Sequence, residues 1–349
     1  MINRRRTRTV DVGNMKIGGD SQISIQSMCN TKISDIDATL DQIARLKEAG
    51  CEIVRLAIPT LKDVEHLRKI REKTDIPLVA DIHFDHRIAI ASAPYVDKLR
   101  INPGNIGDDT KVRLVVEAAK KYSLPIRIGV NGGSLKKELV TKHGNTPEAM
   151  VESAMENIRL LEKNDFFDII VSLKASDVQK TVRAYELLAE KVEYPFHIGI
   201  TEAGTKESGT IKSSVGLGIL LAKGFGDTLR VSLTADPVEE VKVARGILQT
   251  LGLRRYGREI VSCPTCGRTE IDLVRLASEV EKATENIKRP IKIAVMGCVV
   301  NGPGEASDAD IAVVGTKDAG FIYRKGRLIR KVQENMIIDE LLKEIDTTK

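Results

Sequence analysis

Short apolar runs recur eight times between Ser21 and Leu233, and each is followed by a turn and a stretch with helical periodicity. The runs have β-strand character and occupy residues 21–28, 52–58, 77–84, 97–103, 124–130, 168–174, 195–201 and 227–233. The first helical stretch begins with capping residues at Asp35 and ends at Gly50. Eight successive β-α units predict an α/β fold with a closed TIM-type (β/α)8 barrel. The alternative is an open doubly wound sheet, but no Gly-rich phosphate turn follows the first run.

Alternate positions within these runs separate into an apolar face and a polar face. In a closed barrel the apolar face packs against the helices, and the other face points into the lumen. A barrel interior is normally filled by branched apolar side chains. Here the predicted lumen face carries Gln26, Arg55, Asp81, His83, Arg100, Asn102, Arg127, Asn131, Ser172, Lys174, His197, Thr201, Arg230 and Ser232.

Five of these lumen residues are cationic, and burying them is costly without anionic partners. They are Arg55, Arg100, Arg127, Lys174 and Arg230. Asp81 and Glu202 can pair with only some of them, and Arg side chains match phosphate oxygens in bidentate fashion. We therefore expect a substrate with phosphate groups, a diphosphate, at the C-terminal mouth, with Asn102, Asn131 and Ser232 also in contact. The alternative is that some of the cations form structural ion pairs at the bottom of the barrel.

A different pattern begins near residue 257, where a strand-like segment leads into a C-x-x-C motif. A helical stretch, a strand, a second strand, a hairpin and a final amphipathic helix follow. We therefore expect two domains: a substrate-binding barrel over residues 1–256, and a small α+β domain over residues 257–349. Residue 236, an Asp followed by Pro237, marks the start of the eighth barrel helix.

The second domain contains three cysteines in a pattern suited to a soft metal centre. Cys263 and Cys266 lie on a Pro-containing turn, and Cys298 lies in a Gly-flanked loop. A structural zinc site normally uses four Cys or His ligands, and all five His residues lie far upstream. An iron-sulfur cube remains useful with three thiolates and one weaker ligand, for which Glu305 is a candidate. The alternative is a set of ordinary thiols beside a tight turn.

Composition excludes several other classes of function. The 349 residues carry a net charge of +5, 3% aromatic residues and no Trp, which gives little support for nucleic-acid binding. No apolar run approaches the roughly 20 residues needed to span a bilayer, and we expect no membrane association. The basic N-terminal segment is predicted to be a solvated arm. Five cysteines without a secretory context are typical of a reducing compartment, so we expect a cytoplasmic protein.

Several motifs are specific enough to indicate a family. They are VADIHFD, LRINPGNIG, IRIGVNGGS, GITEAG, GDTLRVSLTADPVEEV, CPTCGR and GCVVNGPGE. Together they resemble the (E)-4-hydroxy-3-methylbut-2-enyl diphosphate synthase family of the short bacterial type, over essentially the whole chain. The resemblance implies a TIM-type barrel joined to a domain similar to those of sulfite and nitrite reductases. It also implies one 4Fe-4S cluster, with its ligands at Cys263, Cys266, Cys298 and Glu305.

The resemblance further implies reduction of 2-C-methyl-D-erythritol 2,4-cyclodiphosphate to (E)-4-hydroxy-3-methylbut-2-enyl diphosphate, in non-mevalonate isoprenoid synthesis. Electrons would come from reduced flavodoxin or ferredoxin, and the enzyme would be a homodimer. We expect Glu305 to act at the substrate-binding iron, and Glu202 or His83 to donate a proton. The chain departs from the family pattern at Cys29, where Thr is expected after QSM. Two rivals remain: a barrel transferase similar to dihydropteroate synthase, and an iron-sulfur sensor.

Overall fold

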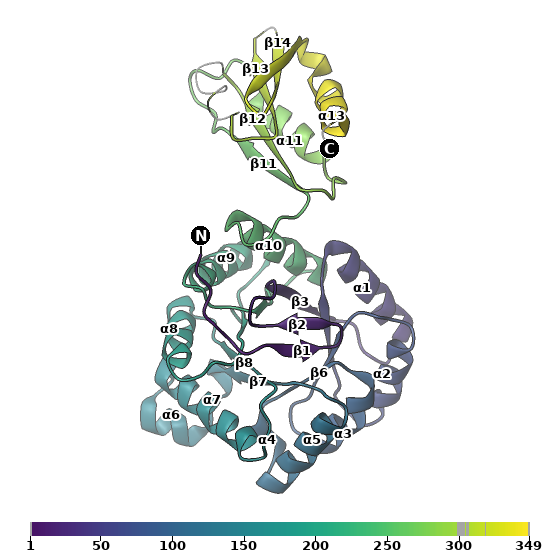
Figure 1. The fold of residues 1–349 in the computed structure, drawn as a ribbon, viewed down its shortest axis with the longest axis vertical. Helices are drawn as coiled ribbons and strands as arrows, with labels where there is room; N and C mark the ends of the chain where they lie inside the picture. The colour runs from purple at the N-terminus through teal and green to yellow at the C-terminus, as the bar shows by residue number, and fades with distance from the viewer. Residues whose placement is uncertain (1, 299–303, 305–306, 318, 348–349) are drawn as a thin grey trace. The chain divides into compact units, whose positions relative to one another are not determined.

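The computed structural model describes residues 2–298, 304, 307–317 and 319–347. The chain forms two compact units, Met1–Arg254 and Arg255–Lys349 (Figure 1). The sequence-predicted boundary at residue 256 lies close to this division. Glu305, the predicted oxygen ligand, lies outside the described residues, so its role stays a prediction.

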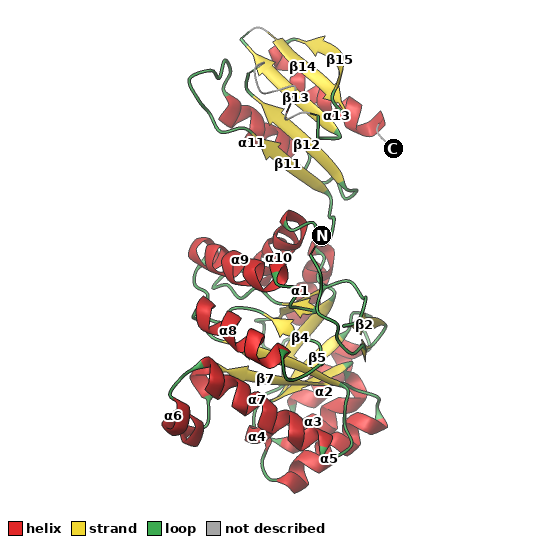
Figure 2. Cartoon of the chain, turned by 60° about the vertical axis from the view of Figure 1, so that its left-hand side comes forward, coloured by secondary structure: helices red, strands yellow, loops and turns green. Residues whose placement is uncertain are grey.

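The first unit is an eight-stranded parallel barrel surrounded by helices (Figures 1 and 2), which confirms the predicted fold class. Its strands run in the order β8-β7-β6-β5-β4-β3-β10-β9, and a bridge between Val171 and Phe196 joins β8 to the segment before β9. The strands are β3 (Ser24–Met28), β4 (Ile53–Ala57), β5 (Leu78–Asp81), β6 (Lys98–Ile101), β7 (Ile126–Asn131), β8 (Ile169–Lys174), β9 (His197–Ile198) and β10 (Thr228–Leu229). β9 and β10 are shorter than predicted. Gly199, directly after β9, weakens the strand because it has no side chain to pack and gains more conformational freedom when unpaired.

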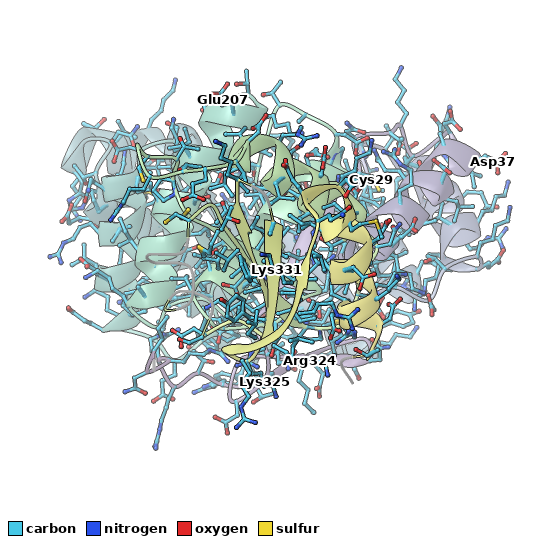
Figure 3. The ribbon with its side chains drawn as sticks, turned by 90° about the horizontal axis from the view of Figure 1, so that it is seen from above. Cys29, Asp37, Glu207, Arg324, Lys325 and Lys331 are labelled. Atoms are coloured by element: carbon cyan, nitrogen blue, oxygen red, sulfur yellow. The ribbon has the colours of Figure 1, made fainter. Side chains whose placement is uncertain are left out.

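The first barrel helix begins and ends where the sequence signals predict, and α10 (Pro237–Thr250) begins at the predicted Asp236 cap. Asp35 accepts a hydrogen bond from the Ala38 N–H at the start of the first helix, and Gly50 ends it with a left-handed φ of 101°. Polar residues such as Asp37 and Glu207 lie on the outer surface (Figure 3). The α-helices are α1 (Ile36–Ala49), α2 (Asp63–Arg71), α3 (His86–Ser92), α4 (Pro103–Ile106), α5 (Asp109–Lys121), α6 (Lys137–His143), α7 (Pro147–Glu162), α8 (Val178–Ala189), α9 (Lys206–Ala222) and α10 (Pro237–Thr250).

A hairpin that the sequence analysis did not predict lies across the barrel (Figure 1). It consists of β1 (Val10–Val12) and β2 (Met15–Ile17). Val10, Val12 and Ile17 form one buried cluster with Ile53, Val79 and Ile170 from the lumen side of three barrel strands. The hairpin therefore closes the amino-terminal end of the barrel.

The prediction of a solvated N-terminal arm is wrong. The Arg5 guanidinium donates to the carbonyl oxygens of Val192 (2.6 Å) and Tyr194 (2.5 Å), and it lies 3.8 Å from the centre of the Phe196 ring. Arg4 forms a 3.0 Å ion pair with Asp227. Main-chain acceptors and an aromatic face thus hold a segment whose charge alone favoured solvent.

The strand register arranges the lumen side chains in layers of four from alternate strands. The first layer, at the closed end, consists of Ile53, Lys98, Ile170 and Thr228, and the second consists of Gln26, Val79, Arg127 and His197. The third layer consists of Arg55, Arg100, Ser172 and Arg230. Above it lie a fourth layer of Met28, Asp81, Gly129 and Gly199, and a fifth of Ala57, Asn102, Lys174 and Ser232. We call the first two the lower layers and the third the cation layer. The lumen is polar above an apolar floor. Sequence analysis missed Lys98, which shares the face of Arg100.

The second unit is a five-stranded sheet in the order β11-β12-β13-β14-β15, and it agrees with the predicted α+β pattern. The first three strands are parallel, and β14 and β15 continue antiparallel. Helices α11 (Leu273–Ala283) and α13 (Ile337–Thr347) pack on one face of the sheet. The strands are β11 (Arg258–Ser262), β12 (Ile291–Met296), β13 (Ile311–Thr316), β14 (Ala319–Arg324) and β15 (Arg327–Val332).

In the part of the chain that the structure describes, no helix is both long and apolar enough to cross a membrane.

Candidate active site

Asp81 is the carboxylate around which the upper lumen is organised. One of its oxygens accepts a 3.0 Å hydrogen bond from Arg100, and the other lies 3.4 Å from His83 Nε2 and 3.9 Å from Arg55 Nε. Burial alone would raise the pKa of Asp81, but the charges of Arg55 and Arg100 and the hydrogen bond from His83 outweigh it and hold the pKa far below the usual carboxyl range. Asp81 is therefore ionised and balances part of the lumen charge.

Arg55 makes an unusual contact with a thioether. Its Nε and Nη2 atoms lie 2.9 and 2.7 Å from the Met28 sulfur, a weak acceptor. Burial lowers the pKa of Arg55 to about 10, although Asp81 acts in the opposite direction. Because the Met28 sulfur is a weak acceptor and the Asp81 carboxylate is distant, the Arg55 guanidinium can still donate hydrogen bonds to a bound anion.

Arg230 has a strong partner that the sequence analysis missed. The Glu240 carboxylate accepts two 3.1 Å hydrogen bonds from Arg230, one of 3.0 Å from the Ser27 hydroxyl and one of 3.1 Å from the Leu233 N–H. Glu240 lies on the buried face of α10, and a carboxylate in an apolar stripe is a signal that could have revealed it. Arg230 was predicted to bind phosphate. Its pairing with Glu240 agrees better with the alternative prediction, that some of the lumen cations form structural ion pairs.

Arg127 and Lys174 have no carboxylate partner of this kind among the described residues. Arg127 is 1% exposed, and its Nε and Nη1 atoms have no hydrogen-bond partner within the described residues. Burial, followed by the neighbouring guanidinium groups, lowers the pKa of both Arg127 and Lys174 well below their ordinary values. Two buried cations that pair with no carboxylate in the described part of the chain favour binding of an anionic ligand.

Two lumen glycines make room for these side chains. A Cβ at Gly129 would lie 2.6 Å from Arg100 Nε, and one at Gly199 would lie 2.7 Å from Lys174 Nζ. Arg100 and Lys174 therefore extend across strands β7 and β9 at positions where other residues would carry a side chain.

We expect Gly129→Ala to lower affinity for inorganic pyrophosphate by about 10-fold, the effect of losing one charge-assisted hydrogen bond. The added methyl group would displace Arg100 from its position beside Asp81. Isothermal titration of the full-length protein would measure the change. Gly218→Ala is the control, because a Cβ at Gly218 contacts nothing within 4 Å. Equal pyrophosphate affinities for both variants would contradict a role of Arg100 in binding the anion.

A cavity of about 310 Å³ opens beside the C-terminal mouth of the barrel. Its lining includes two predicted site residues, Asn131 and Glu202. Glu202 adopts a left-handed φ of 51° and is exposed, and the described ion pairs join the lumen cations to Asp81 and Glu240 rather than to Glu202. Asn102 and Ser232 lie half-buried after β6 and β10. The predicted polar residues thus surround the mouth.

The three cysteines of the predicted metal centre lie in the second unit, near the carboxyl ends of two neighbouring parallel strands. Cys263 directly follows β11 and donates its N–H to Val295 of β12 at 3.4 Å, and Cys298 follows β12 by two residues. The turn after Cys266 is tied to this edge, because the Glu270 N–H donates to the Gly297 carbonyl at 3.1 Å. The fold thus gathers both cysteine loops at one edge of the sheet.

The donor set fits a soft metal centre. Hydrogen bonds from the Arg268 backbone and side chain, and from Thr269, lower the pKa of Cys266, which favours the thiolate that metals bind. Cys298 is buried and Cys263 half-buried, so a bound group would be partly shielded from solvent. Within the described ranges no three His, Cys, Asp or Glu side chains are arranged to hold a metal ion. The fit rests on donor chemistry and on the shared sheet edge.

Both units match the models of one protein family. The GcpE TIM-barrel domain matches residues 7–245, and the GcpE protein C-terminal domain matches residues 259–347. The chain belongs to the GcpE family. This finding confirms the family resemblance inferred from the motifs.

Curated relatives of this GcpE-family chain carry the name 4-hydroxy-3-methylbut-2-en-1-yl diphosphate synthase (flavodoxin). The protein of Maridesulfovibrio salexigens is 57% identical over 349 residues, covering 99% of this chain and 98% of the relative. That of Caldanaerobacter subterraneus subsp. tengcongensis is 56% identical over 345 residues, covering 98% and 97%. The Clostridium perfringens protein is 53% identical and is covered in full, with 99% of this chain.

Among solved structures, dihydropteroate synthase from Xanthomonas albilineans is similar to the GcpE-family chain with a TM-score of 0.51. The match is 12% identical and covers 70% of this chain and 98% of that structure. At this identity the likeness shows a shared barrel fold and no shared reaction.

The two remaining cysteines of this GcpE-family member lie in the barrel unit. Cys29 follows β3 (Figure 3), donates its N–H to the Arg55 carbonyl and is 6% exposed. Burial, with a smaller contribution from Cys51, raises the pKa of Cys29 to about 12. Burial likewise raises the pKa of Cys51 to about 12. Both are protonated thiols at neutral pH, and Cys51 is packed just before β4 with 4% of its surface exposed.

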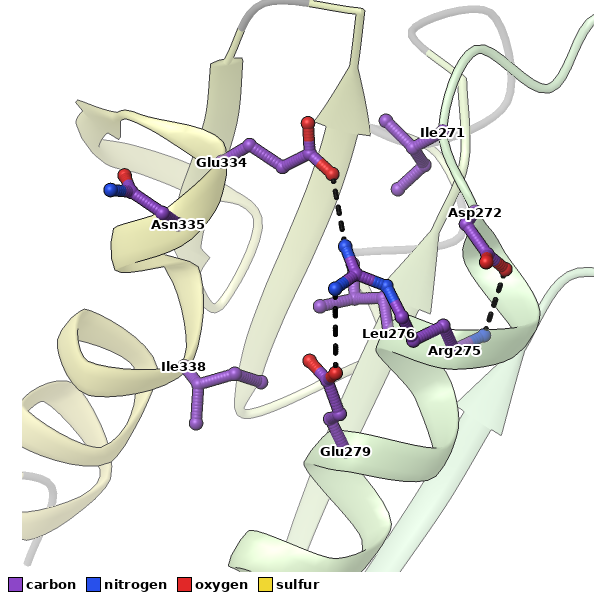
Figure 4. Close-up of a pocket in the computed structure, with 8 residues that line it drawn as sticks. All are labelled: Ile271, Asp272, Arg275, Leu276, Glu279, Glu334, Asn335 and Ile338. Carbon is purple, nitrogen blue, oxygen red and sulfur yellow. Dashed lines mark hydrogen bonds and ion pairs between the residues drawn. The ribbon is translucent and has the colours of Figure 1, made fainter.

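A groove in the second unit lies between α11 and the start of α13 (Figure 4). It has a volume of about 460 Å³, and Arg275 lies across it with ion pairs to Glu334 (3.3 Å) and Glu279 (3.6 Å). Its charges are mutually satisfied, and none of the cysteines lines it. The groove therefore adds nothing to the candidate site.

Proposed function

We propose that the protein catalyses the reductive ring opening of 2-C-methyl-D-erythritol 2,4-cyclodiphosphate to (E)-4-hydroxy-3-methylbut-2-enyl diphosphate. The observation that carries this proposal is its 53–57% identity, over nearly the full length, to proteins named for that synthase activity. The reaction consumes two electrons and releases one oxygen as water. A flavodoxin is the proposed electron donor, as the relatives' names state, with ferredoxin as the second candidate.

The barrel lumen supplies the proposed diphosphate site. Arg127 and Lys174 are buried cations for which the described residues provide no ion pair, and Arg100 shares the Asp81 carboxylate with His83 and Arg55. Among the described residues, Arg55 otherwise donates only to the Met28 thioether. Phosphate oxygens would satisfy the donors of these cations, and Asn102, Asn131 and Ser232 line the way to the mouth. Arg230 is proposed to contribute through its remaining donor capacity. These side chains would orient the ring before any electron arrives.

Cys263, Cys266 and Cys298 are proposed to hold a 4Fe-4S cluster, with Glu305 as the exchangeable fourth ligand. When bound, such a cluster supplies single electrons and a Lewis-acidic iron. His83 and Glu202 are the candidate proton donors: His83 contacts Asp81 at the upper end of the lumen, and Glu202 lines the mouth cavity. Asp81 would hold His83 and Arg100 in place. The proposal extends to a homodimer in the cytoplasm, as the family resemblance implies.

An anaerobic assay of the purified, iron-sulfur-reconstituted protein with the cyclodiphosphate and a low-potential reductant tests the activity. Formation of the linear diphosphate supports it, and absence of turnover in a protein with an intact cluster spectrum would refute it.

We expect Arg100→Ala to weaken cyclodiphosphate binding by roughly 30-fold or more, since truncating a buried charged partner costs at least about 2 kcal/mol. The loss of one cation should also reduce the salt dependence of binding. Titration at two salt concentrations measures both effects. Arg87→Ala is the matched control, because Arg87 is an exposed cation paired with Asp85. Unaltered affinity in Arg100→Ala would remove Arg100 from the diphosphate site.

A further inference from the structure

Lys98 is a fully buried amine that the proposed substrate site does not use. It lies at the start of β6 on the lumen face, is 0% exposed, and its Nζ has no hydrogen-bond partner within the described residues. It shares the lowest lumen layer with Ile53, Ile170 and Thr228. The hairpin cluster beneath these residues is apolar. An ammonium group at this position would be shielded from bulk solvent and would have no carboxylate bonded to it within the described residues.

The charges that face Lys98 from neighbouring elements are mostly of its own sign. Arg55 on β4 and Arg127 on β7 both disfavour a charged amine, and Asp97, directly before β6, favours it. Asp97 already accepts hydrogen bonds from Arg71 (2.9 Å) and from the Leu78 N–H (2.8 Å).

Asp81 and His197 do not change this balance of charges around Lys98. Asp81 on β5 is engaged by Arg100 and His83. His197 on β9 is a fully buried ring whose Nε2 has no partner within the described residues. On the hairpin, Asp11 and Lys16 pair with each other at the surface. Burial first, and then Arg127 and Arg55, lower the pKa of Lys98 well below its ordinary value.

Unpartnered polar atoms are concentrated in this same region of the barrel. In the lower layers, Gln26 Nε2 and Oε1, Arg127 Nε and Nη1, and His197 Nε2 all lack partners within the described part of the chain. Gln26 Oε1 is an acceptor to which an ammonium group on Lys98 could donate, and it has no partner among the described residues. Within the described part of the chain, the lower layers therefore hold acceptor capacity that their own side chains do not use.

We propose that Lys98 is a positioning residue, uncharged in the empty barrel, that takes up one proton when a diphosphate binds in the cation layer above. This inference rests on the proposed function, which places the diphosphate there. The added negative charge offsets the repulsion from Arg55 and Arg127, and the resulting ammonium helps to hold the anion and orders the lower layers. Opening a cyclic diphosphate also frees one more phosphate oxygen, so the lumen charge to be balanced grows during turnover.

The test is titration calorimetry of the full-length, anaerobically reconstituted protein with inorganic pyrophosphate, in two buffers of different ionisation enthalpy at one pH near 7.5. The difference in observed heat gives the number of protons exchanged on binding. We expect wild type to take up about one proton more than Lys98→Met, in which an uncharged side chain of similar length removes the titrating group. Protons released by pyrophosphate itself cancel in this comparison. The exposed Lys121→Met variant should behave as wild type.

A second measurement does not depend on any ligand. A lysine that binds fewer protons in the folded state than in the unfolded state makes folding more favourable as pH rises toward its unfolded pKa of about 10.4. Between pH 7 and pH 10 wild type should therefore gain stability relative to Lys98→Met in denaturant unfolding. A constant difference across this range would overturn the uncharged state of Lys98.

The outcomes separate the two proposals. Binding of pyrophosphate with equal proton numbers in wild type and Lys98→Met would overturn the role of Lys98 and leave the diphosphate site standing. An absence of pyrophosphate binding to wild type would overturn both. Binding with one extra proton in wild type, together with the pH-dependent stability difference, supports the inference.

Discussion

Replacing Cys298 with serine should abolish the visible absorbance of the reconstituted protein and lower turnover by roughly 100-fold or more. Changes to groups that merely support metal ligands already cost about 10–100-fold, and a ligand should cost at least as much. Cys298 follows β12 at the sheet edge that Cys263 also occupies, and it is 8% exposed. Serine is nearly isosteric, so loss of absorbance would reflect the missing thiolate rather than a repacked edge.

The matched control is Cys51→Ala, which removes a buried thiol that the barrel packs and that donates weakly to the Ile53 carbonyl. This variant should keep the cluster spectrum, even if it unfolds at a slightly lower temperature. Reconstitution with iron and sulfide under anaerobic conditions, followed by absorbance and iron analysis, distinguishes the two. A normal iron content in Cys298→Ser would show that Cys298 is not a ligand.

Asp81→Asn should lower the free energy of unfolding by about 3–5 kcal/mol, the usual effect of breaking a buried ion pair from one side. Asp81 is 4% exposed and is engaged by Arg100, His83 and Arg55. The amide keeps the shape of the side chain but removes the negative charge. Arg55 and Arg100 would then repel each other without their shared carboxylate, so the barrel unit should unfold at a lower denaturant concentration.

The pH dependence of this effect has a defined sign. The pKa of Asp81 is lower in the folded protein than its unfolded value of about 3.9. Its stabilising contribution is therefore fully present above pH 4 and is lost as pH falls through the folded pKa. The difference between wild type and Asp81→Asn should stay constant from pH 5 to 8 and narrow in strong acid.

A ligand should partly rescue the variant. Because a bound diphosphate supplies the negative charge that the substituted amide lacks, pyrophosphate should raise the melting temperature of Asp81→Asn more than that of wild type. The control Asp85→Asn changes a carboxylate that caps α3 and pairs with Arg87 near the surface. It should lose less than about 1 kcal/mol, because Asn caps a helix about as well as Asp and an exposed ion pair contributes little. Equal stability losses for the two variants would contradict the central role of Asp81.

The alternation of polar and apolar residues was sufficient to predict the barrel and most of its lumen. A period of two places Arg55, Arg100 and Arg127 on one face of their strands, and the structure places all three in the lumen, with Arg100 and Arg127 buried and Arg55 half-buried. Lys98 lies on the same face as Arg100 and could have been found by extending the alternation back by one step. The strands were predictable because each has one face that must be apolar to pack against helices.

Long-range partners could not be predicted in the same way. Glu240 pairs with Arg230 from a different element, and no local pattern specifies that pair. The N-terminal segment is held by carbonyl oxygens of Val192 and Tyr194, acceptors that every residue possesses and that sequence therefore does not distinguish. The cysteine spacing predicted the donor set, whereas the parallel pairing of β11 and β12 that brings the two loops together emerged only from the fold.

The hairpin of β1 and β2 closes the lumen of the barrel at one end. Its buried residues Val10, Val12 and Ile17 seal the floor, so a polar molecule can enter and leave only through the opposite opening. Substrate and product must then pass through the same opening, so product has to leave before the next substrate molecule can enter. Product release can therefore limit the turnover rate instead of the chemical step.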